Sequence, residues 1–233
     1  MATITAPTTA TEPTGDQCIV MRGVGWKGYK AVLRVRGERS YPRMVYLDGD
    51  LFLMSPAQPH EWIKGRLGRL VMVVVEELDI DCIPAGSTTF RRRLKKGGVE
   101  ADESFYLSNS ARVRGRTDLN LRRVPPPDLV IEAVNTHGAE ESVEVWRRFG
   151  VPEVWVCDGD TLQILSLQPD GSYAEVSSSP AFPYLPAVEM LEWVNKPLAE
   201  SETETTWMKQ LRAWVRDVLE PRARGHANDE GGA

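Results

Sequence analysis

The sequence predicts a mixed α/β protein, and three observations indicate this fold class. Two strand-like runs flank the Asp48-Gly49 pair, which is typical of a tight β-hairpin turn. Apolar residues then recur at helical spacing over residues 60–78. Further strand-like runs follow over residues 81–167, interrupted by one short helical pattern. Strands mixed with helices in this order predict helices packed as layers on a sheet.

Each expected element has its own pattern. Residues 24–33 carry apolar and aromatic side chains at helical spacing, so a helix should precede the hairpin. The helix over residues 60–78 has one broad apolar face and should be buried along it. The run DLVIEAV is almost wholly apolar, which is typical of a strand covered on both faces of a sheet. The other expected strands span 81–92, 99–107, 151–157 and 161–167, with a helix over 139–149.

The 233 residues favour one main domain, which we expect over residues 18–200. Residues 1–17 are rich in Thr, Ala and Pro and should form a disordered leader, because they have little apolar surface to bury. A C-terminal helix is expected over residues 201–220, and its tryptophans could dock on the core or form a homodimer. Residues 221–233 are expected to be a disordered tail.

The composition excludes several classes of protein. The longest strongly apolar run covers residues 70–75, far below the roughly 20 residues that span a bilayer. No signal-peptide pattern is present, and three widely spaced cysteines fit neither a disulfide framework nor a zinc site. We therefore expect a reduced, cytoplasmic protein without a membrane partner. The net charge of −5 disfavours non-specific coating of nucleic acid.

A carboxylate inside the run DLVIEAV is the strongest chemical signal. Burying Glu132 there costs several kcal/mol unless the group is paired or binds a cation. If strands 99–107 and 128–134 are neighbours, Asp102 and Glu132 converge and offer oxygen ligands suited to Mg²⁺ or Mn²⁺. Asp128 lies about 13 Å further along the strand and belongs at the rim.

Structural alternatives exist for each of these residues. Glu132 could be a structural acid held by an arginine, and Asp128 could cap the start of its strand. His60, at the start of the long helix, could be a ligand or proton shuttle, or a surface histidine. Residues 91–123 carry a net charge of +6, which suits a phosphate backbone but also a solvated hairpin rim.

Several motifs resemble one family. Five motifs are similar to successive motifs of the Uma-two family of the PD-(D/E)XK nuclease superfamily: GVGWKGYKAVL, YLDGDLFLMSPAQPHEW, GSTTFRRRLKKGGVEADESFYL, PPPDLVIEA and RRFGVPEVWVCDG. The resemblance covers residues 23–167 and implies a restriction-endonuclease-like fold and Mg²⁺-dependent hydrolysis of DNA phosphodiester bonds. It implies that Asp102 and Glu132 are the metal carboxylates, and that the catalytic set also includes Asp128 and His60.

The chain departs from the family pattern where a basic residue is expected. Val134 stands two residues after the second acid, where the superfamily has lysine, and Ser142 stands at the basic position that relatives use on the following helix. Phe52 replaces a glutamate of the hairpin. The resemblance thus implies a DNA endonuclease with a degenerate site. The alternatives are an inactive nuclease fold that binds nucleic acid or protein, and a structural homodimer in which an arginine neutralises Glu132. Substitutes for the lysine would be Arg147, Arg148, Lys95 or Lys96.

Overall fold

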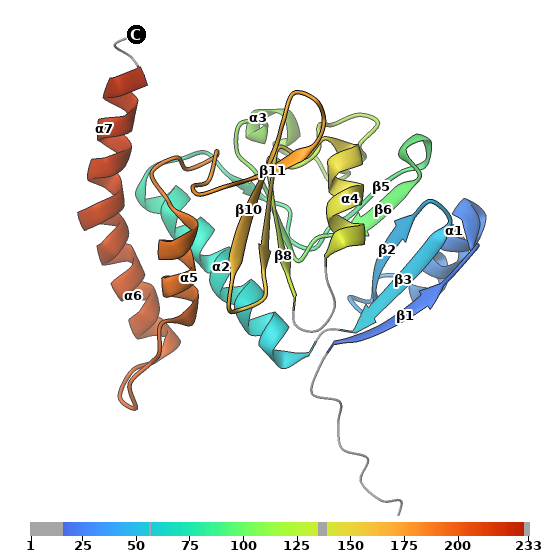
Figure 1. Cartoon of the computed structure of the whole chain (residues 1–233), viewed down its shortest axis with the longest axis horizontal. Helices are drawn as coiled ribbons and strands as arrows, with labels where there is room; N and C mark the ends of the chain where they lie inside the picture. The colour runs from blue at the N-terminus through green and yellow to red at the C-terminus, as the bar shows by residue number, and fades with distance from the viewer. Residues whose placement is uncertain (1–15, 56, 135–138, 231–233) are drawn as a thin grey trace, which may run out of the picture.

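A computed structural model describes residues 16–55, 57–134 and 139–230. It contains a five-stranded and a six-stranded sheet with helices packed around them (Figure 1). This arrangement confirms the predicted mixed α/β class. Below, the five-stranded sheet is called the first sheet and the six-stranded sheet the second sheet.

The first sheet is antiparallel and contains the predicted hairpin. Its strand order is β1-β3-β2-β6-β5, and α1 (Gly25–Arg36) packs on it through the buried ring of Tyr29. Asp48 and Gly49 have φ angles of 52° and 114°, a conformation that Asp and Gly tolerate better than most residues. The strands are β1 (Gln17–Met21), β2 (Arg43–Leu47), β3 (Asp50–Ser55), β5 (Thr89–Arg92) and β6 (Gly97–Glu100).

The second sheet has the order β11-β10-β9-β8-β7-β4. Strands β8 and β9 are parallel and are connected through α4 (Glu140–Phe149), whereas the other pairs are antiparallel. Every residue of β8 is buried, which confirms the prediction from DLVIEAV. The strands are β4 (Ile83–Pro84), β7 (Glu103–Tyr106), β8 (Leu129–Ala133), β9 (Glu153–Cys157), β10 (Leu162–Leu167) and β11 (Tyr173–Val176).

Two of the expected strands are wrong as single elements. The run 99–107 is divided between β6 in the first sheet and β7 in the second, with residues 101 and 102 at the break. The run 81–92 is divided in the same way between β4 and β5. The chain therefore passes between the two sheets at both places. Neither run carries a sequence pattern that marks its break: β6 and β7 are both mostly buried although they belong to different sheets, and β4 and β5 are both only partly buried.

Three apolar clusters hold the layers together. The alternation of side chains along β8 sends Leu129, Ile131 and Ala133 toward α2 (Gln58–Glu77) and the C-terminal helices. It sends Val130 to the opposite face, where α4 packs between the two sheets (Figure 1). Glu132 occupies the same face of β8 as Val130. A third cluster lies under α1.

The C-terminal part extends further as helix than predicted. After α5 (Ala187–Asn195), α6 (Glu204–Trp214) continues through a π-helical turn, Val215–Leu219, into α7 (Glu220–Glu230). The expected disorder from residue 221 is thus wrong up to residue 230. An ion pair between Arg222 and Glu189 of α5 anchors this helix.

The remaining short elements and the chain ends complete the description. α3 (Ser110–Val113) and a 3₁₀ turn, Arg93–Lys95, connect larger elements. Most of the expected leader, residues 1–15, and the last three residues lie outside the described part, while Gln17 already belongs to β1. Across the described ranges, no helix combines the length and apolar character needed to cross a membrane.

Candidate active site

The candidate site lies at the seam between the two sheets, where the chain leaves β6 and starts β7. Glu103 pairs with Ile131 across the β7–β8 ladder, so residue 102 lies opposite Glu132. The Asp102 side chain is 2% exposed, and its Oδ2 accepts the Ala133 N–H at 2.6 Å. This carboxylate therefore satisfies a backbone donor just where regular pairing ends. The prediction that the strand segment after Asp102 lies beside the strand of Glu132 is confirmed.

The other oxygen of Asp102 contacts two further side chains. Oδ1 forms an ion pair with the Arg43 guanidinium from β2 and lies 3.0 Å from His60 Nε2 of α2. Arg43 is 7% exposed and His60 is 1% exposed. A buried ion pair is kept only where the attraction and the hydrogen bonds offset the loss of water, and here each Asp102 oxygen is hydrogen-bonded.

His60 is buried rather than on the surface. Burial and the positive charge of Arg43 both lower the pKa of His60, so the imidazole is neutral near pH 7. The neutral ring donates Nε2–H to Asp102, since a carboxylate can only accept. Its Nδ1 lies 3.6 Å from Oδ2 of Asp16, whose Oδ1 accepts the Ala57 N–H. The start of α2 is thereby tied to the segment before β1.

Glu132 lies on the face of β8 that α4 covers. Its Oε1 accepts the indole N–H of Trp146 at 2.6 Å. Burial raises the pKa of Glu132 to about 7, and the Trp146 hydrogen bond and the Arg43 charge oppose this rise. Arg43 shares a face of β2 with Val45, which packs in the same cluster as Trp146. Arg43 is therefore a positive group close to both candidate acids: it forms an ion pair with Asp102, and its charge lowers the pKa of Glu132.

We expect Glu132→Gln to remove a pH dependence of stability. The folded carboxyl binds its proton more tightly than the unfolded one, because its pKa is about 7 against 4.5. The free energy of unfolding of the parent chain should therefore fall as pH rises from 4.5 through 7. The loss approaches roughly 3 kcal/mol. Urea unfolding in EDTA at about pH 5 and about pH 8 measures this loss. The same change in unfolding free energy between the two pH values in the parent chain and in Glu132→Gln would contradict the prediction.

Asp128 does not join the other three residues. It precedes β8, at the end opposite Glu132. Its Oδ2 accepts the backbone N–H groups of Leu107 and Asn109, and its Oδ1 accepts the Asn109 side-chain amide at 2.6 Å. These contacts fit the interpretation of Asp128 as a cap that fixes the loop after β7.

The donor set around the two acids does not fit a divalent cation in this arrangement. Both Asp102 oxygens already have partners, and one of the two partners of Oδ1, Arg43, is itself a cation. One Glu132 oxygen is held by Trp146. Throughout the described ranges, no three His, Cys, Asp or Glu side chains form a group that could hold a metal ion. At Asp102, the chain itself supplies the positive charge through Arg43.

The expected basic substitutes lie elsewhere. Arg147 and Arg148 both pair with Glu144 on α4, and Arg148 also pairs with Asp48 at the hairpin turn. Ser142 is 6% exposed and lines a cavity of about 230 Å³ between α4 and the β1–β3 edge. Ser142 therefore faces this cavity, and the arginines of α4 are engaged by Glu144 and Asp48.

Sequence reasoning missed Arg43 and Trp146. The signal for Arg43 was present, because RMVYL is an otherwise apolar strand and a buried arginine needs an anion. Trp146 lies on the expected helix 139–149, and a buried Trp N–H usually finds an acceptor, so its indole was a candidate donor to a buried acid.

Comparisons with known proteins agree with this fold. The model of the Uma2 family, described as "Putative restriction endonuclease", matches residues 29–199. The chain belongs to the Uma2 family. Membership supports a nuclease-like function in general terms.

One solved structure similar to this Uma2 chain is described as a putative nuclease of DUF820 from Anabaena variabilis ATCC 29413. The match has a TM-score of 0.50 and 14% sequence identity, and covers 69% of this chain and 96% of the other. At this identity the similarity shows a shared fold alone. No functionally curated protein matches the chain.

Proposed function

We propose that this Uma2 protein binds DNA with a nuclease fold whose hydrolytic centre is degenerate. The observation that carries the proposal is the ion pair between Arg43 and Oδ1 of Asp102. It places a fixed cation at the carboxylate that would otherwise be a metal ligand. Family membership supports a nuclease-like ancestry, and the basic segment over residues 91–123 supports an anionic partner.

The chemistry of the site supports the loss of hydrolysis. A guanidinium can hold a phosphate, but it stays protonated and does not lower the pKa of a bound water as a metal ion does. Val134 and Ser142 leave no lysine to orient an attacking water. The nitrogen of His60 that could accept a proton is Nδ1, but the residue is 1% exposed and Nδ1 faces the Asp16 carboxylate 3.6 Å away.

A second candidate is the metal-dependent DNA endonuclease, with Mg²⁺ or Mn²⁺ on Asp102 and Glu132. Glu132 favours it, since a carboxyl group with a pKa near 7 in a buried strand would be stabilised by a nearby cation. This function requires Arg43 to leave Asp102. The proposed binding function requires the Arg43–Asp102 ion pair to stay intact.

Supercoiled plasmid separates the two candidates. In EDTA, we expect the purified chain to bind the plasmid and slow its migration in a gel. With Mg²⁺ or Mn²⁺, it should nick the plasmid no more than the Glu132→Ala variant does. Calorimetric titration with Mn²⁺ should give the same heats for both proteins. Nicking that needs Mn²⁺ and disappears in both Asp102→Ala and Glu132→Ala would establish the endonuclease instead. Failure to bind both the plasmid and a single DNA strand would refute the proposed binding function.

A further inference from the structure

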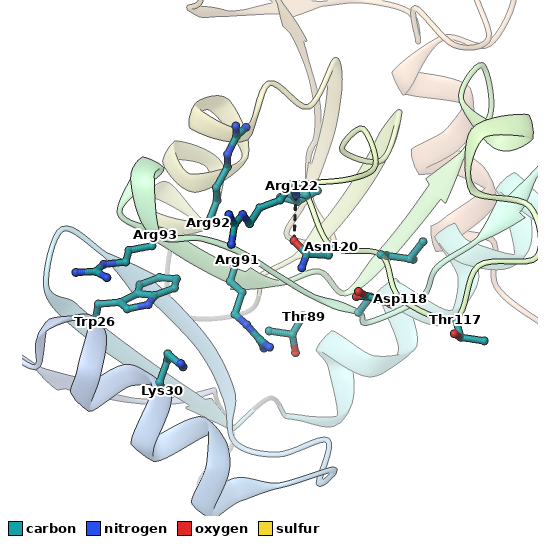
Figure 2. Close-up of a pocket in the computed structure, with 13 residues that line it drawn as sticks. Trp26, Lys30, Thr89, Arg91, Arg92, Arg93, Thr117, Asp118, Asn120 and Arg122 are labelled. Carbon is teal, nitrogen blue, oxygen red and sulfur yellow. Dashed lines mark hydrogen bonds between the residues drawn. The ribbon is translucent and has the colours of Figure 1, made fainter.

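A hollow beside α1 and β5 is strongly basic. It has a volume of about 600 Å³ and lies between α1, β5 and the segment 117–122. Figure 2 shows Arg93 and Lys30 on either side of the Trp26 ring, with Arg91 and Arg122 across from them. The lining holds five cationic side chains and one carboxylate, Asp118. The cations are Lys30, Arg91, Arg92, Arg93 and Arg122.

This hollow continues toward the candidate site. A second hollow of about 310 Å³ shares Lys30, Thr89 and Arg91 with it. A third, of about 370 Å³, shares Arg36 and Thr89 with the second and is also lined by Arg43. We call the three together the basic groove. Because Arg43 contacts Asp102, one end of the basic groove lies next to the candidate site.

In the described part of the chain, the cations of the basic groove pair with carboxylates only at the end near the candidate site. Near the site, Arg36 pairs with the buried Glu100 and Arg43 with Asp102. At the far end, no carboxylate of the described residues lies within 4.0 Å of the five cations that line the first hollow. Unbalanced cations along a groove favour a ligand with repeated negative charges. They are notable in a chain whose net charge is −5.

Trp26 adds a flat aromatic surface beside these cations. Its ring packs at 5.4 Å from the Tyr29 ring and 5.5 Å from the Tyr46 ring, so neighbours from α1 and β2 fix its position. The ring remains partly exposed and lines the first hollow near Lys30 and Arg93 (Figure 2). A fixed aromatic ring among cations is the arrangement by which single-strand-binding proteins stack an unpaired base. Bases within a duplex are already stacked on one another.

We propose that the basic groove binds a single-stranded segment of nucleic acid. The backbone contacts the unbalanced cations, a base stacks on Trp26, and the strand runs toward the Arg43–Asp102 pair. This inference rests on the proposed function, because it names the form of nucleic acid that the same protein binds. It requires no hydrolysis, so it can be tested without metal.

Fluorescence anisotropy with a labelled DNA strand of about 12 nucleotides in EDTA tests the groove. We expect the double variant Lys30→Glu/Arg91→Glu to weaken binding at least about tenfold, since both side chains are exposed and carry no ion pair. The slope of log affinity against log salt should become shallower by about 1.4, which is about 0.7 for each lost phosphate contact. The matched control is Lys209→Glu, an exposed lysine on α6, which should change affinity less than about twofold.

Two further measurements test the single-strand preference. Trp26→Leu should weaken binding of the single strand by about 5- to 100-fold, which corresponds to the loss of one stacked base. A blunt hairpin duplex of the same sequence should bind at least about tenfold more weakly than the strand. Thermal unfolding of each variant shows that the fold is retained.

Each contrary result has a distinct meaning. A duplex that binds as tightly as the strand, or a Trp26→Leu variant with unchanged affinity, would overturn the single-strand assignment while DNA binding stands. Equal losses in Lys30→Glu/Arg91→Glu and Lys209→Glu would overturn the groove as the binding surface. No binding of either DNA by the parent chain would instead refute the proposed function.

Discussion

Arg43→Gln should lower the free energy of unfolding by about 3–5 kcal/mol. The substitution removes the cation that pairs with Asp102, while Asp102 stays buried at 2% exposure. An ionised carboxylate without its partner in such a place is strongly unfavourable, because water cannot replace the lost charge. For a chain of 233 residues the loss corresponds to a decrease in Tm of roughly 6–20 °C.

Arg22→Gln is the matched control for this change. Arg22 pairs with Asp50 at 2.8 Å, but its side chain is 78% exposed, so the same substitution should cost less than about 1 kcal/mol. Urea unfolding of both variants measures the difference. Equal losses would show that Asp102 does not depend on Arg43. A Tm of Arg43→Gln that rises with Mn²⁺, while the Tm of the parent chain does not, would show that a metal ion can replace the guanidinium.

Arg66→Met should destabilise the chain by a similar amount, about 3–5 kcal/mol. Arg66 is 1% exposed on α2 and donates to the carbonyl oxygens of Val194 and Lys196 at 2.7 and 2.8 Å. It also donates to Glu204 at the start of α6 at 2.9 Å. Methionine fills a similar volume but has no donor, so these acceptors lose their partners.

Arg66 also stacks between two tryptophan rings. Its Cζ lies 4.2 Å from the centre of the Trp62 ring and 5.1 Å from that of Trp207. These contacts connect α2 to α6, so the variant should expose the C-terminal helices as well as unfold at lower urea. Limited proteolysis together with urea unfolding measures both effects.

Arg69→Met is the control that isolates burial from charge. Arg69 pairs with the same carboxylate, Glu204, at 3.2 Å, yet its side chain is 52% exposed. Its loss should cost less than about 1 kcal/mol and leave the C-terminal helices protected. Similar losses in the two variants would mean that Glu204 pairing alone, and not the buried clamp, connects the helices.

Much of the fold is predictable from local pattern, as three elements show. The hairpin at Asp48-Gly49, the buried strand β8 and the helix α4 all follow from spacing or turn chemistry within a few residues. The division of 99–107 and 81–92 between two sheets does not follow from local pattern, because the pairing of β4, β5, β6 and β7 involves partners from other parts of the chain. Only the long-range packing decides which sheet a strand joins.

For the site too, local sequence pattern predicts some features, and only the long-range packing decides the others. The convergence of Asp102 with the strand of Glu132 was predictable, because a buried acid requires a partner. That Arg43 pairs with Asp102 was not, since its strand is 59 residues earlier in the chain and belongs to the other sheet. Asp128 lies on the same strand run as Glu132 but at its opposite end, about 13 Å away, where it accepts hydrogen bonds from Asn109.

The carboxylate of Asp102 connects both sheets to the first turn of α2, since it binds Arg43, His60 and the amide of Ala133. Selection for folding alone would therefore conserve this aspartate in a lineage that had given up catalysis. The presence of an aspartate at this position is explained by its structural contacts. It is therefore weak evidence that a family member still catalyses hydrolysis.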